Sequence, residues 1–326
     1  MKYILLLWAL YASLNTYGQD CSTASLSQKP GIWKEGMKGS VSGIPAADLD
    51  KERKVVASLH NLIKSKYSPI GVEADFNGAY DSPDTEMPGN NYDYRVYFMP
   101  YICEKNIITT AHETSTTFSI SSNRFDGNIY EIADESNIPE GYYSLKRMPV
   151  VKDGYYYFEE NASLGFGQSG ISRNWLITID GKLPFSFVTK TEFLEKQKQM
   201  LLKAMPKEIE NSNESHKLNT EKNYKNALAK LETLLKMPSD ESGQPAIVKQ
   251  DPSDYLSYLF TTDNDPFGKV LIKPNPGYFN SKLTRSSPQF FLVNITGNEK
   301  DPVASKVMTD LMKDFDFSAL KNMLGK

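Results

Sequence analysis

The stretches GVEADFNGAY (71–80) and YDYRVYFMPY (92–101) decide the fold class that the sequence predicts. In the second stretch, aromatic and apolar side chains alternate with the charged side chains of Asp93 and Arg95. Successive side chains of a β-strand point to opposite faces, so this alternation is typical of a strand with one buried face. The segment DSPDTEMPGNN between the two stretches is rich in turn residues. We therefore predict two neighbouring strands.

The residues on either side extend this sheet and place a helix before it. From residue 46 to residue 66, apolar residues recur at spacings of three and four, which predicts a helix with one buried face. TSTTFSISS (114–122) continues the β-branched composition. Asp153-Gly154 and Asp180-Gly181 each lie between two strand-like runs, and each pair predicts a type I′ hairpin because glycine adopts positive φ without steric cost. We expect residues 46–189 to form an antiparallel β-sheet domain with a packed N-terminal helix.

A capping box predicts where a helical pair begins. Thr189 precedes Glu192 by three residues, so its hydroxyl can accept a hydrogen bond from the first turn of a helix. Val188 and Phe193 occupy the two positions of a hydrophobic staple. We therefore expect a helix that begins at Lys190.

The remaining sequence predicts a second helix and a smaller C-terminal α+β part. The first helix should end near Pro206, the polar join NSNESHKLN should be a mobile loop, and the second helix should span about residues 219–237. GQPAIVKQ, KVLIKP and QFFLVNIT favour strands, DYLSYLF favours a helix, and Asp301-Pro302 is typical of a helix start. The predicted class is α+β, with residues 190–326 as its second part.

Residues 1–18 have the layout of a secretory signal peptide. Lys2 is followed by an apolar run and then by the small residues Thr16 and Gly18, which predicts cleavage after about Gly18. A membrane span needs about 20 apolar residues, more than this run offers, and no other stretch is long and apolar enough. Residues 19–45 form an irregular lead-in. We expect a soluble protein that is secreted or periplasmic, with no membrane span after cleavage.

The charge and the cysteine content limit which kinds of partner and which cellular compartment the sequence predicts. The chain carries 37 basic and 40 acidic side chains, a net charge of −3, so we expect no nucleic-acid partner. An oxidising compartment would favour a disulfide between Cys21 and Cys103. The alternative is a buried free thiol at Cys103 and a mobile Cys21. Lipid attachment at Cys21 is disfavoured because Asp20 stands where a small residue is needed.

The glycine-rich stretch GFGQSG (165–170) matches the spacing of a dinucleotide-binding loop, but its context does not fit. A strand pattern follows it, so no helix N-terminus would face a phosphate. We predict a loop or bulge between two strands. Ser169 has the wrong spacing for a nucleophile elbow, and nothing in the sequence brings a histidine to it. The candidate bases are His60, His112 and His216.

Metal and cofactor motifs are incomplete, so we expect neither. Ala111-His112-Glu113 lacks the second histidine of a zinc-protease helix, because Thr116 stands there. The stretch from Asp263 to Gly268 resembles the start of a calcium loop, but Pro274 replaces the bidentate glutamate. We predict a surface turn before the strand KVLIKP.

Tyrosines are the candidate ligand-binding residues. Tyr94 and Tyr97 lie in one strand-like stretch and Tyr155 and Tyr157 in another, and such rings can stack on sugar faces. Tyrosines also favour half-buried strands for structural reasons alone, and that interpretation is the simpler one. Carboxylates such as Asp93, Glu159 and Glu160 are the candidates for glycoside hydrolysis, which needs two of them roughly 5–10 Å apart.

Two segments resemble patterns in uncharacterised secreted proteins of Gram-negative bacteria: NWLITIDGKLPFSFVTKTEFLEKQK (174–198) and PQFFLVNITGNEKDPVASKVM (288–308). The resemblance implies export and a bacterial envelope setting and adds no catalytic residue. Our main hypothesis is an exported, non-enzymatic protein that binds a glycan, another envelope component or a protein partner. The alternative is a hydrolase that acts on carbohydrate or another envelope polymer. A third hypothesis is self-assembly through the helices of residues 190–237.

Overall fold

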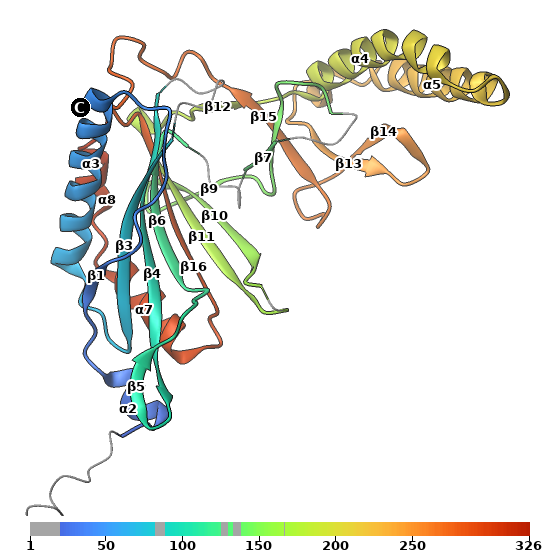
Figure 1. Ribbon diagram of the computed structural model, residues 1–326. Coiled ribbons are helices and arrows are strands. Elements are labelled where there is room, and N and C mark those ends of the chain that lie inside the picture. Colours follow the sequence, from blue (N-terminus) through green and yellow to red (C-terminus); the bar gives the residue numbers. More distant parts are fainter. Residues whose placement is uncertain (1–19, 82–88, 125–129, 133–137, 166) are drawn as a thin grey trace, which may run out of the picture.

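The computed structural model describes residues 20–81, 89–124, 130–132, 138–165 and 167–326. The predicted signal peptide lies outside the described residues. The fold is α+β, as the sequence predicts, and it contains two sheets with helices packed on each (Figure 1).

The larger sheet runs in the order β1-β3-β4-β6-β16-β11-β10-β9, with β2 beside β3 and β5 beside β4. β1 and β2 are parallel to β3, and the other neighbours are antiparallel. The two predicted strands are β3 and β4, which pair directly. The strands are β1 (Trp33–Glu35), β2 (Val41–Ser42), β3 (Val72–Asp81), β4 (Asn91–Glu104), β5 (Ile107–Thr110), β6 (Thr117–Ser122), β9 (Val150–Lys152), β10 (Tyr155–Ser163), β11 (Ser169–Thr178) and β16 (Phe290–Gly297).

One face of this sheet is covered by α3 (Ala46–Lys66), α7 (Pro302–Lys313) and α8 (Phe317–Lys321) (Figure 1). α3 occupies the predicted span, because its apolar stripe packs against the apolar face of β3 and β4. The predicted start of α7 is confirmed as well: the Asp301 carboxylate accepts hydrogen bonds from the backbone N–H groups of Val303 and Ala304.

The smaller sheet runs in the order β14-β13-β15-β8-β7, with β12 beside β15. Its strands are β7 (Tyr130–Ile132), β8 (Tyr143–Leu145), β12 (Phe185–Phe187), β13 (Ile247–Asp251), β14 (Asp254–Phe260) and β15 (Lys269–Pro274). The two sheets take their strands from the chain in an interleaved order, since β8 lies in the smaller sheet and β16 in the larger one. They pack together through a shared apolar cluster that includes Leu145 and Ile272 on one side and Phe158 and Leu292 on the other.

The helical pair consists of α4 (Lys190–Asn211) and α5 (Glu214–Leu234), which pack on the smaller sheet and extend away from the larger one (Figure 1). The predicted start of α4 is confirmed, because the Thr189 hydroxyl accepts a hydrogen bond from the Glu192 N–H. The predicted mobile loop between the helices is wrong. Polar residues that face solvent can continue a helix, so α4 runs through Pro206 and only residues 212–213 separate it from α5.

Two further local predictions are wrong, and one is confirmed. Both residues of Asp180-Gly181 have positive φ, but their turn, η1 (Ile179–Gly181), passes the chain from one sheet to the other and does not close a hairpin, because β12 pairs with β15 and not with β11. DYLSYLF forms strand β14, because it pairs along β13. Asp153-Gly154 does connect a hairpin: both residues have positive φ, and Lys152 pairs with Tyr155.

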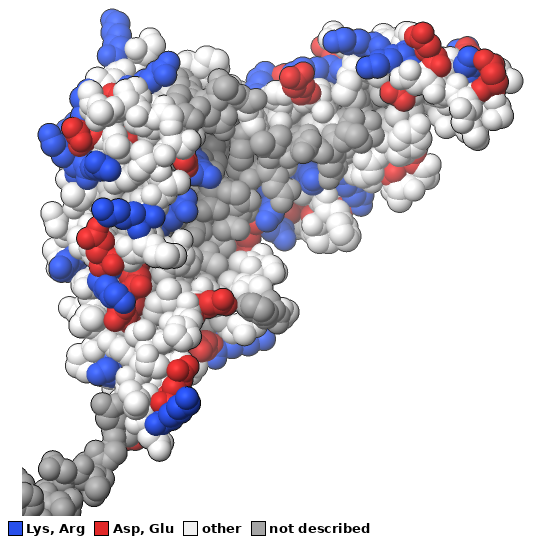
Figure 2. Space-filling model, in the orientation of Figure 1, with Lys and Arg blue, Asp and Glu red and all other residues white. Residues whose placement is uncertain are grey.

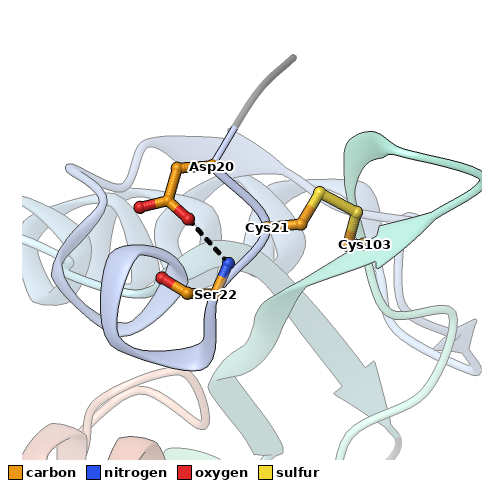
Figure 3. Close-up of a disulfide and its surroundings, with 4 residues drawn as sticks. All are labelled: Asp20, Cys21, Ser22 and Cys103. Atoms are coloured by element: carbon orange, nitrogen blue, oxygen red, sulfur yellow. Dashed lines mark hydrogen bonds between the residues drawn. A yellow bond between two sulfur atoms is a disulfide. The ribbon is translucent and has the colours of Figure 1, made fainter. Parts of the chain in front are cut away.

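A disulfide joins Cys21 to Cys103, with a Cα–Cα distance of 5.6 Å (Figure 3). The prediction of a disulfide is therefore confirmed, and the free-thiol alternative is wrong. Asp20 accepts a hydrogen bond from the Ser22 N–H, and Ser22 caps the short helix α2 (Thr23–Gln28). The disulfide thus fixes the N-terminal segment to the end of β4.

Candidate ligand site on the polar face of the larger sheet

The face of the larger sheet opposite α3 carries polar side chains along its central strands. We call it the polar face. The strand register places its residues in two adjacent rows. The first row is Asn77, Arg95, Ser119, Asn294 and Asn174, and the second is Asp75, Tyr97, Thr117, Thr296, Ser172 and Glu160. Asp93 and Ser121 lie beside the first row, opposite each other on β4 and β6.

A hollow of about 250 Å³ lies in this face around Asp93, and we call it the Asp93 hollow. Its lining comes mainly from β4 and β6, whose alternate residues share the polar face. The lining side chains include Arg95, Tyr97 and Arg124, together with Ser119, Ser121 and Asn294. Aromatic, charged and hydroxyl groups therefore converge on one concave site.

Asp93 is the most buried charged group of the hollow, with 2% of its side chain exposed. One of its oxygens, Oδ2, pairs with Arg95 and lies 3.5 Å from Arg124 Nη1. The same Arg124 nitrogen lies 3.4 Å from an oxygen of Asp81. Burial opposes the charge on Arg95, but the Asp93 carboxylate outweighs this effect and raises the pKa of Arg95 above its ordinary value. Two guanidinium groups and two carboxylates thus balance each other.

The second oxygen of Asp93, Oδ1, is buried and has no hydrogen-bond partner within the described part of the chain. A buried carboxylate oxygen without a partner is unfavourable, by about 1–3 kcal/mol or more. A ligand hydroxyl would supply the missing hydrogen bond, because a hydroxyl group can donate to a carboxylate.

Next to the hollow, the polar face carries a buried network of amide and hydroxyl groups. Asn294 donates to Ser172 Oγ at 2.8 Å and to Asn174 Oδ1 at 2.7 Å. Thr296 Oγ1 lies 3.1 Å from Ser172 Oγ and 3.2 Å from Asn294 Oδ1, and its single hydroxyl hydrogen can bond to either oxygen. These side chains satisfy each other, so they form a fixed polar floor that continues the hollow toward β11.

On the other side of the hollow, β3 adds two carboxyl groups. Glu73 pairs with Lys34 at 2.7 Å. Burial, reinforced by a hydrogen bond that the protonated Asp75 donates to the neighbouring Glu73 carboxylate, raises the pKa of Asp75 above its ordinary value. Asp75 lies directly opposite Tyr97 in the register, so its carboxyl group belongs to the same stretch of the polar face.

The four tyrosines proposed from the sequence do not meet. Tyr97 lines the Asp93 hollow. Tyr94 is fully buried on the opposite face, where its hydroxyl lies 3.0 Å from Nδ1 of His60. Tyr155 and Tyr157 lie on β10, on the face of the sheet that the helices cover. Three strands, β6, β16 and β11, lie between β10 and β4.

The three proposed carboxylates are also apart. Glu159 lies on the helix-covered face, where a hydrogen bond from Tyr157 and then its contact with Arg173 lower its pKa. Glu160 shares the polar face with Asp93, but four steps between strands separate them, roughly 19 Å at about 4.8 Å per step. This separation is well beyond the range of about 5–10 Å for a pair of glycosidase carboxylates.

The other sequence motifs occupy structural positions. Gly165 and Gly167 of GFGQSG lie between β10 and β11, as predicted, Phe166 lies outside the described residues, and Ser169 begins β11. His60 is on α3, His112 precedes β6 and His216 is on α5, and no hydrogen bond joins any of them to Ser169 in the described part of the chain. The stretch from Asp263 to Gly268 is the predicted turn before β15. Across the described ranges, no group of three or more histidine, cysteine, aspartate or glutamate side chains could hold a metal ion.

Sequence reasoning identified Asp93 and Tyr97 as candidates, but it missed Arg124 and the buried network around Asn294. The signal for the network was present in two stretches that had been considered only as strands. TFSISS alternates between apolar residues and small polar ones, and SRNWLIT carries Ser172 and Asn174 two residues apart, so each stretch indicates a strand with small polar side chains on one face.

Comparisons with protein-family models, with curated proteins and with solved structures found no match to this chain. Among the helices that the structure describes, none is both long and apolar enough to span a bilayer. On the surface shown in Figure 2, basic and acidic side chains are interspersed.

Proposed function

We propose that this protein is an exported, non-enzymatic binding protein, and that the Asp93 hollow takes a neutral, hydroxyl-rich ligand such as a sugar residue of an envelope glycan. The observation that carries the proposal is the buried Asp93 carboxylate, which has one oxygen held by arginines and the other without a partner among the described residues. Sugar hydroxyls suit this arrangement because each can donate to a carboxylate and accept from a guanidinium group.

The charge balance of the hollow favours a neutral ligand over an ionic one. Arg95 and Arg124 are offset by Asp81 and Asp93, so neither an anion nor a cation would gain a net electrostatic attraction from these four groups. Tyr97 adds a ring at the wall, which can pack on the apolar side of a sugar. The volume of about 250 Å³ suits a small ligand or one residue of a longer glycan.

Export is supported by the disulfide between Cys21 and Cys103, because such bonds persist mainly in oxidising compartments. An oxidising compartment outside the cytoplasm is also where the protein would meet an envelope glycan. The hydrolase hypothesis has less support, because Asp93 and Glu160 are too far apart to act on one glycosidic bond and Glu159 faces the other side of the sheet.

The test is a saccharide-binding screen on residues 19–326 by isothermal titration calorimetry, with each ligand also incubated and analysed for cleavage. We expect a saccharide to bind without turnover and Asp93→Asn to weaken binding at least tenfold. Asp153→Asn is the matched control, since it makes the same chemical change in an exposed hairpin turn and should bind as the wild type does. The thermal unfolding midpoint of each variant establishes that it is folded.

Two results would contradict this proposal. Equal affinity of the wild type and Asp93→Asn would show that the ligand binds elsewhere. Cleavage of a bound saccharide that is lost on replacing one carboxylate would make the protein an enzyme.

A further inference from the structure

The Asp93 hollow is longer in one direction than in the other. It is lined by three pairs of residues that lie opposite each other on β4 and β6: Asp93 with Ser121, Arg95 with Ser119, and Tyr97 with Thr117. The first and last pairs are four residues apart along each strand. At about 3.4 Å per residue this is about 14 Å, whereas the two strands are only about 4.8 Å apart. The hollow is therefore a furrow that runs parallel to β4.

A bridge of ion pairs closes the furrow at its Asp93 end. Asp81 is the last residue of β3, and β4 lies between β3 and β6. Arg124 follows the end of β6, and its Nη1 lies 3.5 Å from Asp93 Oδ2 and 3.4 Å from Asp81 Oδ2. The Arg124 side chain thus reaches from β6 over β4 to the end of β3. A chain that lies in the furrow must stop at Asp93, because this bridge stands across its path.

The opposite end of the furrow, at Tyr97, leads onto more of the polar face. Asp75 of β3 lies directly opposite Tyr97 in the strand register. Both side chains are only partly buried, and Asp75 Oδ1 has no hydrogen-bond partner in the part of the chain that the structure describes. The nearby ion pair of Lys34 and Glu73 joins β1 to β3, so it lies to one side of β4 and β6. The furrow therefore continues past Tyr97 with a ring and a carboxyl group along it.

We propose that the Asp93 hollow binds the end of an unbranched glycan chain, with the terminal sugar residue at Asp93 and the next residues along β4, past Tyr97 and Asp75. This inference rests on the proposed function, because it specifies which part of a glycan that site takes. Single bonds of about 1.5 Å make a sugar ring with its two outer oxygens roughly 6 Å long. The distance of about 14 Å from Asp93 to Tyr97 therefore corresponds to about two to three residues.

The chemistry of a chain end suits the closed end of the furrow. In a terminal residue, the hydroxyl that would otherwise form the next glycosidic bond is free. It can therefore donate a hydrogen bond to Asp93 Oδ1, which has no partner among the described residues. The next residue packs its apolar side on the Tyr97 ring, and its hydroxyls face Asp75. An interior residue lacks the free hydroxyl and has a neighbour where the Arg124 bridge stands.

The first experiment is calorimetric titration of residues 19–326 with linear oligosaccharides of glucose and of N-acetylglucosamine, from one to six residues long. Affinity should rise at least about tenfold between one residue and three, because a hydrogen bond to a charged group contributes about that factor or more. It should then stay level, since later residues extend beyond Asp75.

The end of the chain is tested with tagged forms of the same oligosaccharides. Each is prepared with a bulky fluorophore at its reducing end or at its non-reducing end. One tagged form should bind at least about tenfold more weakly than the untagged one, because its tagged end cannot enter the closed end of the furrow. The other tagged form should bind as the untagged one does.

Variants locate the direction of the chain. Asp75→Asn should weaken binding of a three-residue chain by a larger factor than binding of a single sugar, whereas Asp93→Asn should weaken both by the same factor. Asp153→Asn is again the matched control in an exposed hairpin turn, and it should bind every length as the wild type does. The thermal unfolding midpoint of each variant establishes that it is folded.

Three results would overturn this inference and leave the proposed function in place. They are equal affinity for one residue and for three, undiminished binding of both tagged forms, and loss of binding with either tag. The second would mean that the site takes the interior of a chain, and the third that both ends are enclosed. Failure of every saccharide to bind would overturn the proposed function and this inference together.

Discussion

Replacement of the buried Glu52 by glutamine should remove a pH-dependent loss of stability. Glu52 lies on α3 with none of its surface exposed. Its Oε1 accepts a hydrogen bond from Asn90 Nδ2 at 2.6 Å, whereas Oε2 has no partner among the residues that the structure describes. Burial, with a smaller contribution from Asp48, raises the pKa of Glu52 from its ordinary 4.5 to about 7 against the opposing hydrogen bond from Asn90.

The sign and size of the effect follow from proton linkage. Between pH 4.5 and about 7, the unfolded chain releases the Glu52 proton while the folded chain keeps it. The free energy of unfolding therefore falls as the pH rises through this range and levels off above it. One pH unit is worth about 1.4 kcal/mol, so the full loss is about 3 kcal/mol.

The assay is urea unfolding followed by circular dichroism at pH 4, pH 6 and pH 8. Glutamine keeps the carbonyl that Asn90 donates to and cannot ionise. Relative to the wild type, Glu52→Gln should therefore gain about 3 kcal/mol between pH 4 and pH 8. Glu104→Gln, on the exposed end of β4, should show no such gain. A constant difference between Glu52→Gln and the wild type over this range would refute the reasoning.

Three further predictions concern stability. Replacing Cys21 and Cys103 by serine should lower the free energy of unfolding by about 4 kcal/mol in urea titrations, because the disulfide closes a loop with a sequence separation of 82. Gly31→Ala would place a methyl carbon 2.0 Å from the carbonyl oxygen of Val72, so β1 must shift. We expect a loss of about 1–3 kcal/mol, measured in the same way. Asp301→Ala removes the cap of α7 and should cost about 1 kcal/mol, seen as a lower thermal unfolding midpoint.

The correct predictions concern elements whose bounds are set by residues within or next to the element itself. α3 occupies the predicted span because its apolar stripe repeats at helical spacing. Thr189 and Asp301 begin α4 and α7, because a capping side chain bonds to its own helix. Asp153-Gly154 turns a hairpin because both residues adopt positive φ. In each case, the partners that decide the structure lie within a few residues.

The incorrect strand and turn predictions depend on partners outside the segments themselves. DYLSYLF has a composition that suits a helix, but its neighbour β13 supplies a strand to pair with. Asp180-Gly181 resembles a hairpin turn, but the next strand pairs with β15, more than 80 residues away. No short pattern in β16 indicates that it lies between β6 and β11. The same limit applies to the site, since Asp93 lies 31 residues from Arg124.

On one face of the larger sheet, apolar residues give way to polar ones. This change favours a ligand-binding role for the polar residues over a purely structural one. On β16, Leu292 packs against the smaller sheet, whereas Asn294 on the same face belongs to the buried network. Replacing a mutually bonded polar pair by apolar side chains of similar shape is often neutral or stabilising. Stability alone therefore does not require amide and hydroxyl groups where the apolar cluster could have continued. A site that must present fixed donors and acceptors beside Asp93 does require them, because hydroxyl-rich ligands are distinguished by such groups.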